Sequence, residues 1–423
     1  MEDSKNSQVV VVVDALSTGQ YFAPHLKKRG YKCVHVLSSP NASKLLLDTF
    51  HPHDFIENII YRGDIKSVVN SLKTHNVILV IPGSELGVEM ADNLSRQLGL
   101  PRNDTTISLA RRNKYMMQEN VRARGLRAIK EKFSTNLNEI LSWAKAQNVF
   151  PVVLKPVEDA GTEGVHFCNS LEEIEKAYNS IMHHINTLGF ENKAVLAQER
   201  IKGTECIVNT VSFQGKHYIT DHWQYRKIIS EDSSPIYDYG RLIPHPSENN
   251  HELVKYDSDV LDALGFQNGP AHAEIMLTDT GPVLIEVGAR VMGASMPPEI
   301  VSECIGHNQL DLTIDCFLNH KHFLKQVERP YKIVKHCMMK ILISYKAGQI
   351  ESVPGKEIIE KLSSAKVVRI PVKSGDSIAR TVDLFTSPGE VLLVNSDPAI
   401  LEADYKRICE LENEGLFQYK SEV

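Results

Sequence analysis

Two glutamates stand in apolar surroundings near the middle of the chain. Residues 272–290 read HAEIMLTDTGPVLIEVGAR, in which Glu274 and Glu286 flank the turn-like TDTG and Arg290 follows four residues later. Strand-like runs of this kind normally carry aliphatic residues toward a core. Two carboxylates on one face would suit a divalent cation, since Mg²⁺ takes one or two carboxylates and completes its shell with phosphates and water.

The pairing of the two strands decides whether the glutamates meet. If paired residue numbers sum to 560, Glu274 lies opposite Glu286, His272 and Gly288 share their face, and the connecting loop is residues 278–282. A sum of 559 places the two glutamates on opposite faces. Directly opposed carboxylates, about 5 Å apart, repel each other unless a cation lies between them. The alternative is an exposed face with two unrelated acids, and the sequence leaves both readings open.

A lysine and a glycine loop lie upstream of this hairpin. Lys155 ends the strand-like FPVVLKP, and the loop DAGTEGV (159–165) follows. Gly161 and Gly164 would let backbone N–H groups approach an anion closely. Taken alone, such a lysine is more often an edge residue whose stem lies on apolar surface.

The segment QERIKGTE (198–205) follows the strand-like KAVLAQE. Its extended backbone would suit recognition of an adenine edge, and Glu205 could accept hydrogen bonds from ribose hydroxyls; the alternative is a plain connector. Other nucleotide motifs are missing, because DALSTG after the first strand lacks GxGxxG and the chain has no GxxxxGK[ST] loop.

Taken in order, these segments resemble the ATP-grasp superfamily of carboxylate–amine ligases. The resemblance rests on Lys114 in RRNKYMM, Lys155 in VVLKP, the glycine loop, QERIKGTE, and Glu274 with EVGAR, and it covers residues 105–320. It implies ATP as a substrate and Mg²⁺, or Mn²⁺ in its place, as the metal. The implied ATP-binding residues are Lys114, Lys155, Gly161, Thr162, Gly164, Gln198, Glu199, Ile201 and Glu205. Glu274 and Glu286 would ligate the metal, and Arg290 would be the catalytic cation that stabilises developing negative charge.

Two departures from the family pattern bear on function. Many members carry ExNxR, whose Asn is a further metal ligand, whereas this chain has Gly288 at that position. EVGAR with its preceding hairpin is more similar to the L-amino acid ligases, which join two free amino acids. The second departure is Glu163, an acid inside a loop meant to cover polyphosphate, which we expect to point outward or toward metal.

The resemblance therefore implies an ATP-dependent amino-acid ligase that makes dipeptides through an aminoacyl phosphate. Two alternatives stay open: an ATP-grasp ligase with another carboxylate or amine acceptor, and a non-catalytic nucleotide-binding regulator. Retention of both lysines, both glutamates and Arg290 speaks against the regulator. The expected substrate-binding residues are Glu85, His272, Arg290, Met292 and Ser295, with Glu85 holding a substrate ammonium unless it is a solvated loop acid.

These residues need strands and helices to position them, and the pattern indicates an α/β protein of ATP-grasp architecture. Val9–Val13 and the segment 76–99 alternate strands with helices, which predicts a Rossmann-like parallel-sheet domain over residues 1–110. We expect a small α+β lid domain at 111–197, a large domain with the metal site at 198–320, and a C-terminal α+β subdomain at 321–423.

Composition sets the remaining expectations. A net charge of −6 without a basic stripe argues against nucleic acid as a partner. No apolar stretch is long enough for a membrane span, and the seven scattered cysteines suggest reduced thiols and a cytoplasmic location. Small-molecule amino acids are the expected partners, and a homodimer is the oligomeric state considered.

Overall fold

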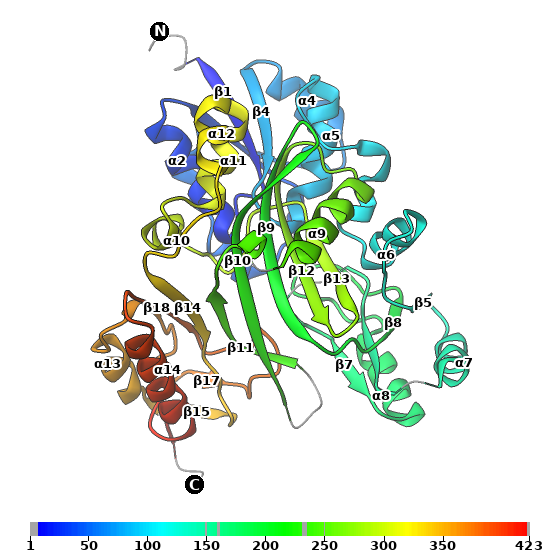
Figure 1. Ribbon diagram of the computed structural model, residues 1–423, viewed down its shortest axis with the longest axis vertical. Helices are drawn as coiled ribbons and strands as arrows, with labels where there is room; N and C mark the ends of the chain where they lie inside the picture. Colours follow the sequence, from blue (N-terminus) through cyan, green and yellow to red (C-terminus); the bar gives the residue numbers. More distant parts are fainter. Residues whose placement is uncertain (1–6, 149, 159–160, 231–234, 249, 421–423) are drawn as a thin grey trace.

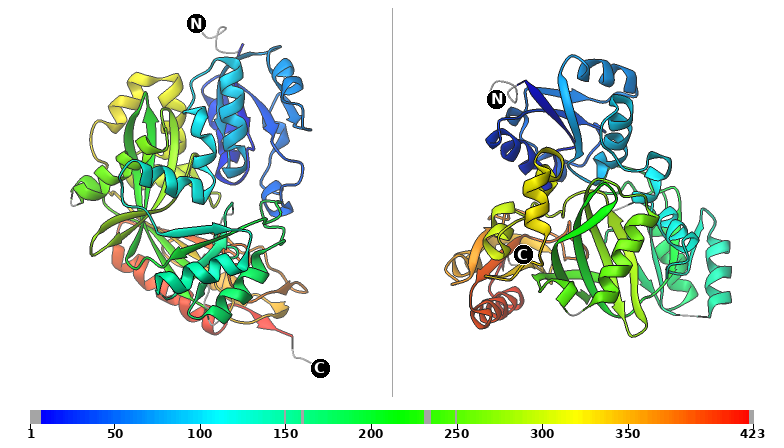
Figure 2. Two further views of the ribbon diagram at one scale, coloured as in Figure 1. Left: turned by 90° about the vertical axis from the view of Figure 1, so that its right-hand side faces the viewer. Right: turned by 45° about the horizontal axis from the view of Figure 1, so that its top comes forward.

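The computed structural model describes residues 7–148, 150–158, 161–230, 235–248 and 250–420 (Figure 1). Figures 1 and 2 show a blue N-terminal domain at one end of the molecule, with the lid and the C-terminal segment at the other end, on either side of a large central sheet. Helices and strands alternate or combine in every part, which confirms the α/β prediction.

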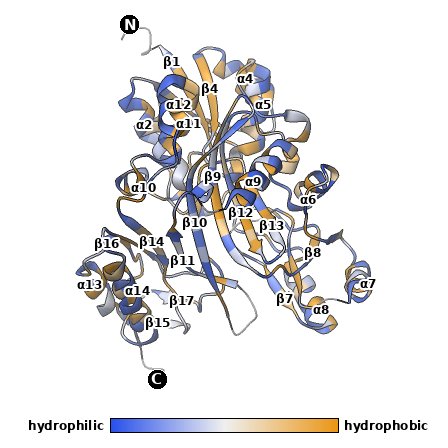
Figure 3. Cartoon of the chain, viewed as in Figure 1, coloured by the Kyte–Doolittle hydropathy of each residue, from blue (hydrophilic) through white to orange (hydrophobic). Residues whose placement is uncertain are grey.

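The N-terminal domain is a four-stranded parallel sheet, as predicted. The strand order is β3-β2-β1-β4, and all three pairings are parallel. The strands are β1 (Gln8–Val13), β2 (Lys32–Leu37), β3 (Glu57–Ile60) and β4 (Asn76–Pro82). The helices are α2 (Phe22–Lys28), α3 (Lys44–Leu47), α4 (Ile65–Leu72) and α5 (Val88–Leu98). The valines of β1 are buried, and β1 and β4 are coloured as hydrophobic in Figure 3, as expected for a parallel sheet covered on both faces.

The lid is a four-stranded antiparallel sheet with two helices. Its strand order is β5-β8-β6-β7. The elements are β5 (Glu131–Ser134), α7 (Leu137–Gln147), β6 (Val152–Pro156), β7 (His166–Cys168), α8 (Leu171–Ile181) and β8 (Val195–Glu199). The preceding helix α6 (Lys114–Ala123) packs through Met117 and Val121 into the core of the large domain.

The central sheet has eight strands in the order β13-β12-β9-β10-β11-β14-β18-β16, all paired antiparallel. Its first five strands are β9 (Thr204–Phe213), β10 (Lys216–Ile229), β11 (Pro235–Leu242), β12 (Gly269–Thr278) and β13 (Gly281–Gly288). The other three, β14 (His336–Ile341), β16 (Ala365–Arg369) and β18 (Glu390–Asn395), come from the last hundred residues. The C-terminal segment therefore extends the sheet that carries the glutamates.

Within the described residues, six helices and a three-stranded sheet complete the large domain and the C-terminal segment. The helices are α9 (His251–Ala263), α10 (Pro298–Ile305), α11 (Gln309–Leu318), α12 (His320–Val327), α13 (Pro354–Glu360) and α14 (Pro398–Asn413). The small sheet has the order β17-β15-β19, formed by Ser377–Ile378, Gly348–Ser352 and Gln418–Tyr419. No helix in the described part of the chain is long and apolar enough to cross a membrane.

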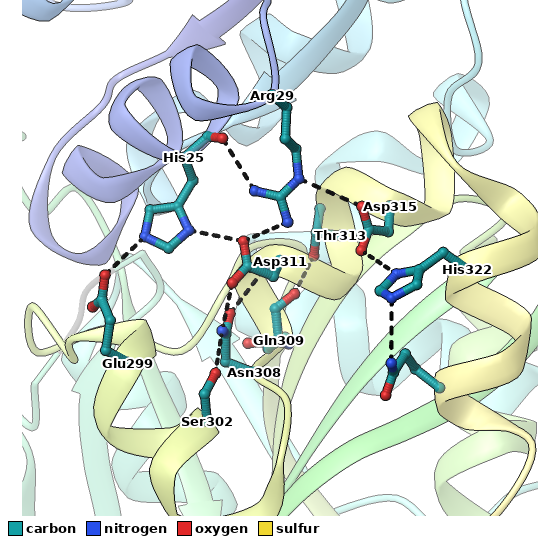
Figure 4. Close-up of polar contacts among 11 residues, drawn as sticks. His25, Arg29, Glu299, Ser302, Asn308, Gln309, Asp311, Thr313, Asp315 and His322 are labelled. Atoms are coloured by element: carbon teal, nitrogen blue, oxygen red, sulfur yellow. Dashed lines mark hydrogen bonds and ion pairs between the residues drawn. The ribbon is translucent and has the colours of Figure 1, made fainter.

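Polar contacts hold the N-terminal domain against the large domain (Figure 4). His25 of α2 is buried between Asp311, 2.8 Å from its Nδ1, and Glu299, 3.2 Å from its Nε2. Arg29, on the same face, contacts Asp311 at 2.8 Å and Asp315 at 3.5 Å. These contacts hold α2 of the N-terminal domain against α10 and α11 of the large domain.

Candidate active site

The hairpin β12–β13 brings the two glutamates together as predicted. Glu274 pairs with Glu286, and His272 pairs with Gly288. The predicted loop is wrong, however, because Thr278 pairs with Gly281 and only two residues connect the strands. An irregularity after Glu274 accounts for the difference: the pairing sum is 559 next to the turn and 560 at the glutamates, so a bulge at Ile285 restores their common face.

A pocket between the lid and the central sheet contains most of the predicted ATP-binding residues. It is lined by Lys114, Lys155, Gly161, Thr162, Gln198, Glu199, Ile201, Glu205, Glu274 and Glu286, among others. Gly164 is adjacent in the loop and has a φ of 66°, like Thr162. Asp159 and Ala160, which begin the predicted loop, lie outside the described residues.

Two lysines line this pocket from different elements. Lys114 is the first residue of α6, whose N-cap Asn113 accepts the N–H of Met116, and its Nζ lies 3.1 Å from Glu286 Oε2. Lys155 on β6 is buried, and burial together with the nearby Lys114 lowers the pKa of Lys155 to about 8. A lysine ammonium is a compact point charge, so Lys155 is suited to an anionic ligand in this pocket.

A third lysine, Lys227 on β10, was not found from the sequence. Its Nζ lies 2.6 Å from Glu205 Oε1, 3.9 Å from Glu274 Oε2 and 4.3 Å from the centre of the Tyr237 ring. Burial acts to lower its pKa, but Glu205 and Glu274 raise the pKa of Lys227 above its ordinary value. Lys227 is therefore a permanent cation beside the two acids.

The acids respond to this cation in different ways. Burial raises the pKa of Glu205 to about 7, although Lys227 opposes the shift. Burial also acts to raise the pKa of Glu274, but Lys227 and His272 outweigh it and hold that pKa well below its ordinary value. Glu274 is thus a buried carboxylate that stays ionised.

The donor set at the hairpin suits Mg²⁺. Glu274 and Glu286 offer hard carboxylate oxygens on one face, directly opposite one another. Among the described residues, no group of three or more His, Cys, Asp or Glu side chains is arranged to hold a metal without help. Two carboxylates are sufficient only if phosphate oxygens and water complete the shell, which is the usual arrangement for Mg²⁺ bound with a nucleotide.

The glycine loop contains a buried threonine hydroxyl, that of Thr162. Within the described residues, Thr162 Oγ1 is shielded from solvent and makes no hydrogen bond. The Glu163 carboxylate is held by other groups of the lid, since its Oε2 accepts the Thr187 N–H at 2.8 Å and its Oε1 lies 3.5 Å from His184. Glu163 nevertheless lines the pocket, and the buried Thr162 hydroxyl can donate to a phosphate oxygen.

The segment 198–205, predicted to frame adenine, contacts Glu131, a polar partner that the sequence did not indicate. Gln198 Nε2 donates to Glu131 Oε2 at 2.7 Å, and burial raises the pKa of Glu131 to about 7. Glu199 Oε1 accepts the backbone N–H of Lys130 at 3.0 Å, so its side chain braces the strand rather than facing a ligand. Ile201 lines the pocket.

A second pocket adjoins the first at Glu274 and Glu286. Gly161, Tyr237, Glu274 and Glu286 line both pockets. The second also receives Ser17, Ser84 and Glu85 from the N-terminal domain, His272, Arg290 and Ser295 from the large domain, and Arg369, Phe385 and Glu390 from the C-terminal segment. Met292 is buried and lines a separate small cavity behind this pocket, so the structure does not bring it to the other predicted substrate residues.

Arg290 and His272 are held in fixed orientations. Arg290 Nε donates to Glu85 Oε2 at 3.1 Å, and its Nη1 donates to the Val291 carbonyl. Asn209 Nδ2 donates to the Asp221 carboxylate, which leaves Asn209 Oδ1 to accept from His272 Nδ1 at 2.8 Å. Burial lowers the pKa of His272, and its Nε2 lies 3.8 Å from Glu274 Oε1.

Comparisons with known proteins agree with this geometry. Residues 148–298 match the family model described as an ATP-grasp domain. The chain is 32% identical over 421 residues to dapdiamide A synthase of Enterobacter agglomerans, covering 96% of each protein. It is 24% identical over 310 residues to the alanine–anticapsin ligase of Bacillus subtilis (strain 168), covering 67% of this chain and 64% of that protein.

Solved structures show the same fold. The crystal structure of an L-amino acid ligase from Bacillus licheniformis superposes with a TM-score of 0.76 at 20% identity and covers 99% of this chain and 100% of that one. The N5-carboxyaminoimidazole synthetase of Staphylococcus aureus, complexed with ADP, superposes with a TM-score of 0.68 at 12% identity, covering 95% and 96%. The chain belongs to the ATP-grasp family, as an ATP-dependent carboxylate–amine ligase. Within that family it is similar over nearly its whole length to dapdiamide A synthase.

Proposed function

We propose that the protein joins two amino acids into a dipeptide, with ATP and Mg²⁺. The carboxylate of one amino acid attacks the γ-phosphorus of ATP, giving an aminoacyl phosphate and ADP. The amine of the second amino acid then attacks the acyl carbon, and the tetrahedral intermediate releases phosphate as the peptide bond forms. The observation that carries the proposal is the junction of the two pockets, where Glu274 and Glu286 face both the nucleotide side and the side with Glu85 and Arg290.

The charged residues in and around this junction have separate chemical tasks in the proposal. Lys114, Lys155 and Lys227 bind the phosphates of ATP and offset their charge. Mg²⁺ held by Glu274 and Glu286 would neutralise the transferring phosphoryl group. Arg290 donates to the oxyanion of the tetrahedral intermediate, a contribution typically worth about 10²–10³ in rate.

The proposed lid excludes water from the acyl phosphate, which water would otherwise hydrolyse. The glycine loop contacts the C-terminal segment, because Leu384 N–H donates to the Gly161 carbonyl at 3.1 Å. A Cβ at Gly161 would lie 2.9 Å from the Phe385 ring. The C-terminal segment thus supports the loop directly above the junction of the pockets.

Two further assignments belong to the proposal. Gln198, Glu199 and Ile201 frame adenine, mainly through backbone groups, and Glu205 binds ribose. The alternative function, a ligase with a non-amino-acid carboxylate or another amine acceptor, uses the same phosphate and metal residues. Glu85 beside Arg290 favours amino acids, because it places an acceptor for an ammonium next to a donor for a carboxylate. A homodimer and a cytoplasmic location stay predictions.

Phosphate release from ATP and Mg²⁺ tests the function. The twenty common L-amino acids are supplied singly and in pairs, and products are identified by mass spectrometry. Release that depends on particular amino acids, with a dipeptide mass, supports the proposal. Absence of release with every pair, despite ATP binding, would contradict it and favour the alternative ligase.

A further inference from the structure

Gly288 is buried and leaves a gap next to Glu85, a residue that lines the second pocket. A Cβ at this position would lie 2.6 Å from Glu85 Oε2 and 3.4 Å from Arg290 Cζ. Gly288 is not among the described residues with positive φ, so its backbone would accept any L-residue. Glycine is therefore required here for space and not for conformation.

The gap is filled by a carboxylate from another domain. Glu85 follows β4, and its side chain reaches across to Arg290, with Nε and Oε2 3.1 Å apart. The turn that presents Glu85 is tightly held, because a Cβ at Gly83 would lie 2.5 Å from the Asp14 carbonyl and one at Gly87 would lie 2.5 Å from the Val13 carbonyl. Glu85 is thus delivered to Gly288 by a close-packed turn.

Two polar side chains at this end of the pocket, Ser84 and Glu85, have unused hydrogen-bonding capacity among the described residues. In the described part of the chain, Ser84 Oγ is shielded from solvent and makes no hydrogen bond. The only hydrogen bond that the described residues give the Glu85 carboxylate is the one to Oε2 from Arg290, which leaves Oε1 with acceptor capacity. A buried hydroxyl without a partner is costly unless a ligand satisfies it. A ligand with an ammonium beside a carboxylate would satisfy Glu85, Ser84 and Arg290 together.

We infer that Gly288 determines the specificity of the first, carboxylate-activating step. By leaving room for Glu85, it makes the enzyme select carboxylic acids that carry an ammonium group close to the carboxylate over amine-free acids. This inference rests on the proposed ligase function and adds the residue that sets its substrate class. A side chain at position 288 displaces the flexible end of Glu85 and not backbone, so the fold is retained while the ammonium site is lost.

The test measures activation separately from peptide-bond formation. Hydroxylamine replaces the second substrate, since its amine attacks the acyl phosphate and yields a hydroxamate and phosphate. The probes are the amino acid that gives the most hydroxamate and its des-amino analogue. The quantity compared is the ratio of their kcat/KM values in wild type, Gly288→Ala, Glu85→Ala and the double variant.

We expect the wild-type ratio to favour the amino acid by about 10- to 100-fold, the usual range for a hydrogen bond to a charged group. Each single variant should bring the ratio close to one. The double variant should lose no more than either single variant, because both changes remove the same contact. Glu89→Ala is the matched control: it removes an exposed acid of α5 that lines neither pocket, so the ratio should stay at its wild-type value. Affinity for an ATP analogue and the thermal unfolding temperature report folding.

The opposing outcomes are distinct. A wild-type ratio near one overturns the inference and leaves the ligase function standing. A Gly288→Ala enzyme that keeps the ratio, or a double variant whose loss equals the product of the single losses, shows that Gly288 does not act through Glu85. If no acid of either kind yields hydroxamate or phosphate, the proposed function fails and the inference fails with it.

Discussion

The depressed pKa of Lys155 makes ATP affinity depend on pH in a defined window. With a pKa of about 8 in the empty pocket, the Lys155 ammonium is about 90% populated at pH 7 and about 10% populated at pH 9. Phosphate binds the charged form, so the bound nucleotide raises the pKa of Lys155 and affinity is lost as pH rises through 8. If only the ammonium form binds well, the Kd for a non-hydrolysable ATP analogue should rise about tenfold between pH 7 and pH 9.

Isothermal titration calorimetry tests this prediction. Titrations at pH 8 in buffers of different ionisation enthalpy should show net uptake of about half a proton per nucleotide bound. Lys155→Met should bind the analogue at least about tenfold more weakly at pH 7 and should lose both the pH dependence and the proton uptake. A wild-type Kd that stays constant from pH 7 to pH 9, or equal proton uptake in wild type and Lys155→Met, would refute the reasoning.

Three further predictions concern the metal, the lid and the domain contact. Glu286→Gln should abolish Mg²⁺-dependent turnover with an unchanged circular dichroism spectrum, and unchanged turnover would contradict the metal assignment. Gly161→Ala, which forces a methyl group against Phe385, should leak acyl phosphate to water, so that phosphate released exceeds dipeptide formed; a one-to-one ratio would count against the lid. Asp311→Asn should lower stability by about 2 kcal/mol by weakening the contacts to His25 and Arg29. Burial acts to raise the pKa of Asp311, but His25 outweighs burial, so the net pKa of Asp311 is depressed. The stability that the Asp311 carboxylate contributes is therefore present above about pH 4 and lost at lower pH. Equal thermal unfolding temperatures for Asp311→Asn and wild type at pH 7 would contradict this prediction.

Local sequence patterns were sufficient to predict the elements whose side chains follow a simple period along the chain. The valine run of β1 and its alternation with helices predicted the parallel sheet, because buried parallel strands are apolar on both faces. The period of two in a strand reduced the question to two registers, of which the one that pairs Glu274 with Glu286 is found at the glutamates. It could not predict the bulge at Ile285, since an extra residue in one strand leaves no distinct composition behind.

Other features depend on contacts between distant segments. The pairing of β10 with β9 places Lys227, and the register of this pairing shifts between Ile219 and Asp221. The proximity of Lys227 to Glu205 could therefore not be predicted by counting residues along the two strands. The C-terminal strands join the central sheet by pairing β14 with β11, more than ninety residues apart. Glu85 and Gly288 meet only after the N-terminal domain has docked, and neither residue is distinctive alone.

Transfer of oxygen from substrate to phosphate tests the central claim most directly. The amino acid that donates its carboxylate is labelled with ¹⁸O, and the phosphate released during dipeptide synthesis is analysed by mass spectrometry. Attack of the carboxylate on the γ-phosphorus predicts one ¹⁸O in each phosphate released, with ADP as the other product. Unlabelled phosphate accompanying dipeptide, or the label in AMP, would contradict an aminoacyl phosphate and the mechanism built on it.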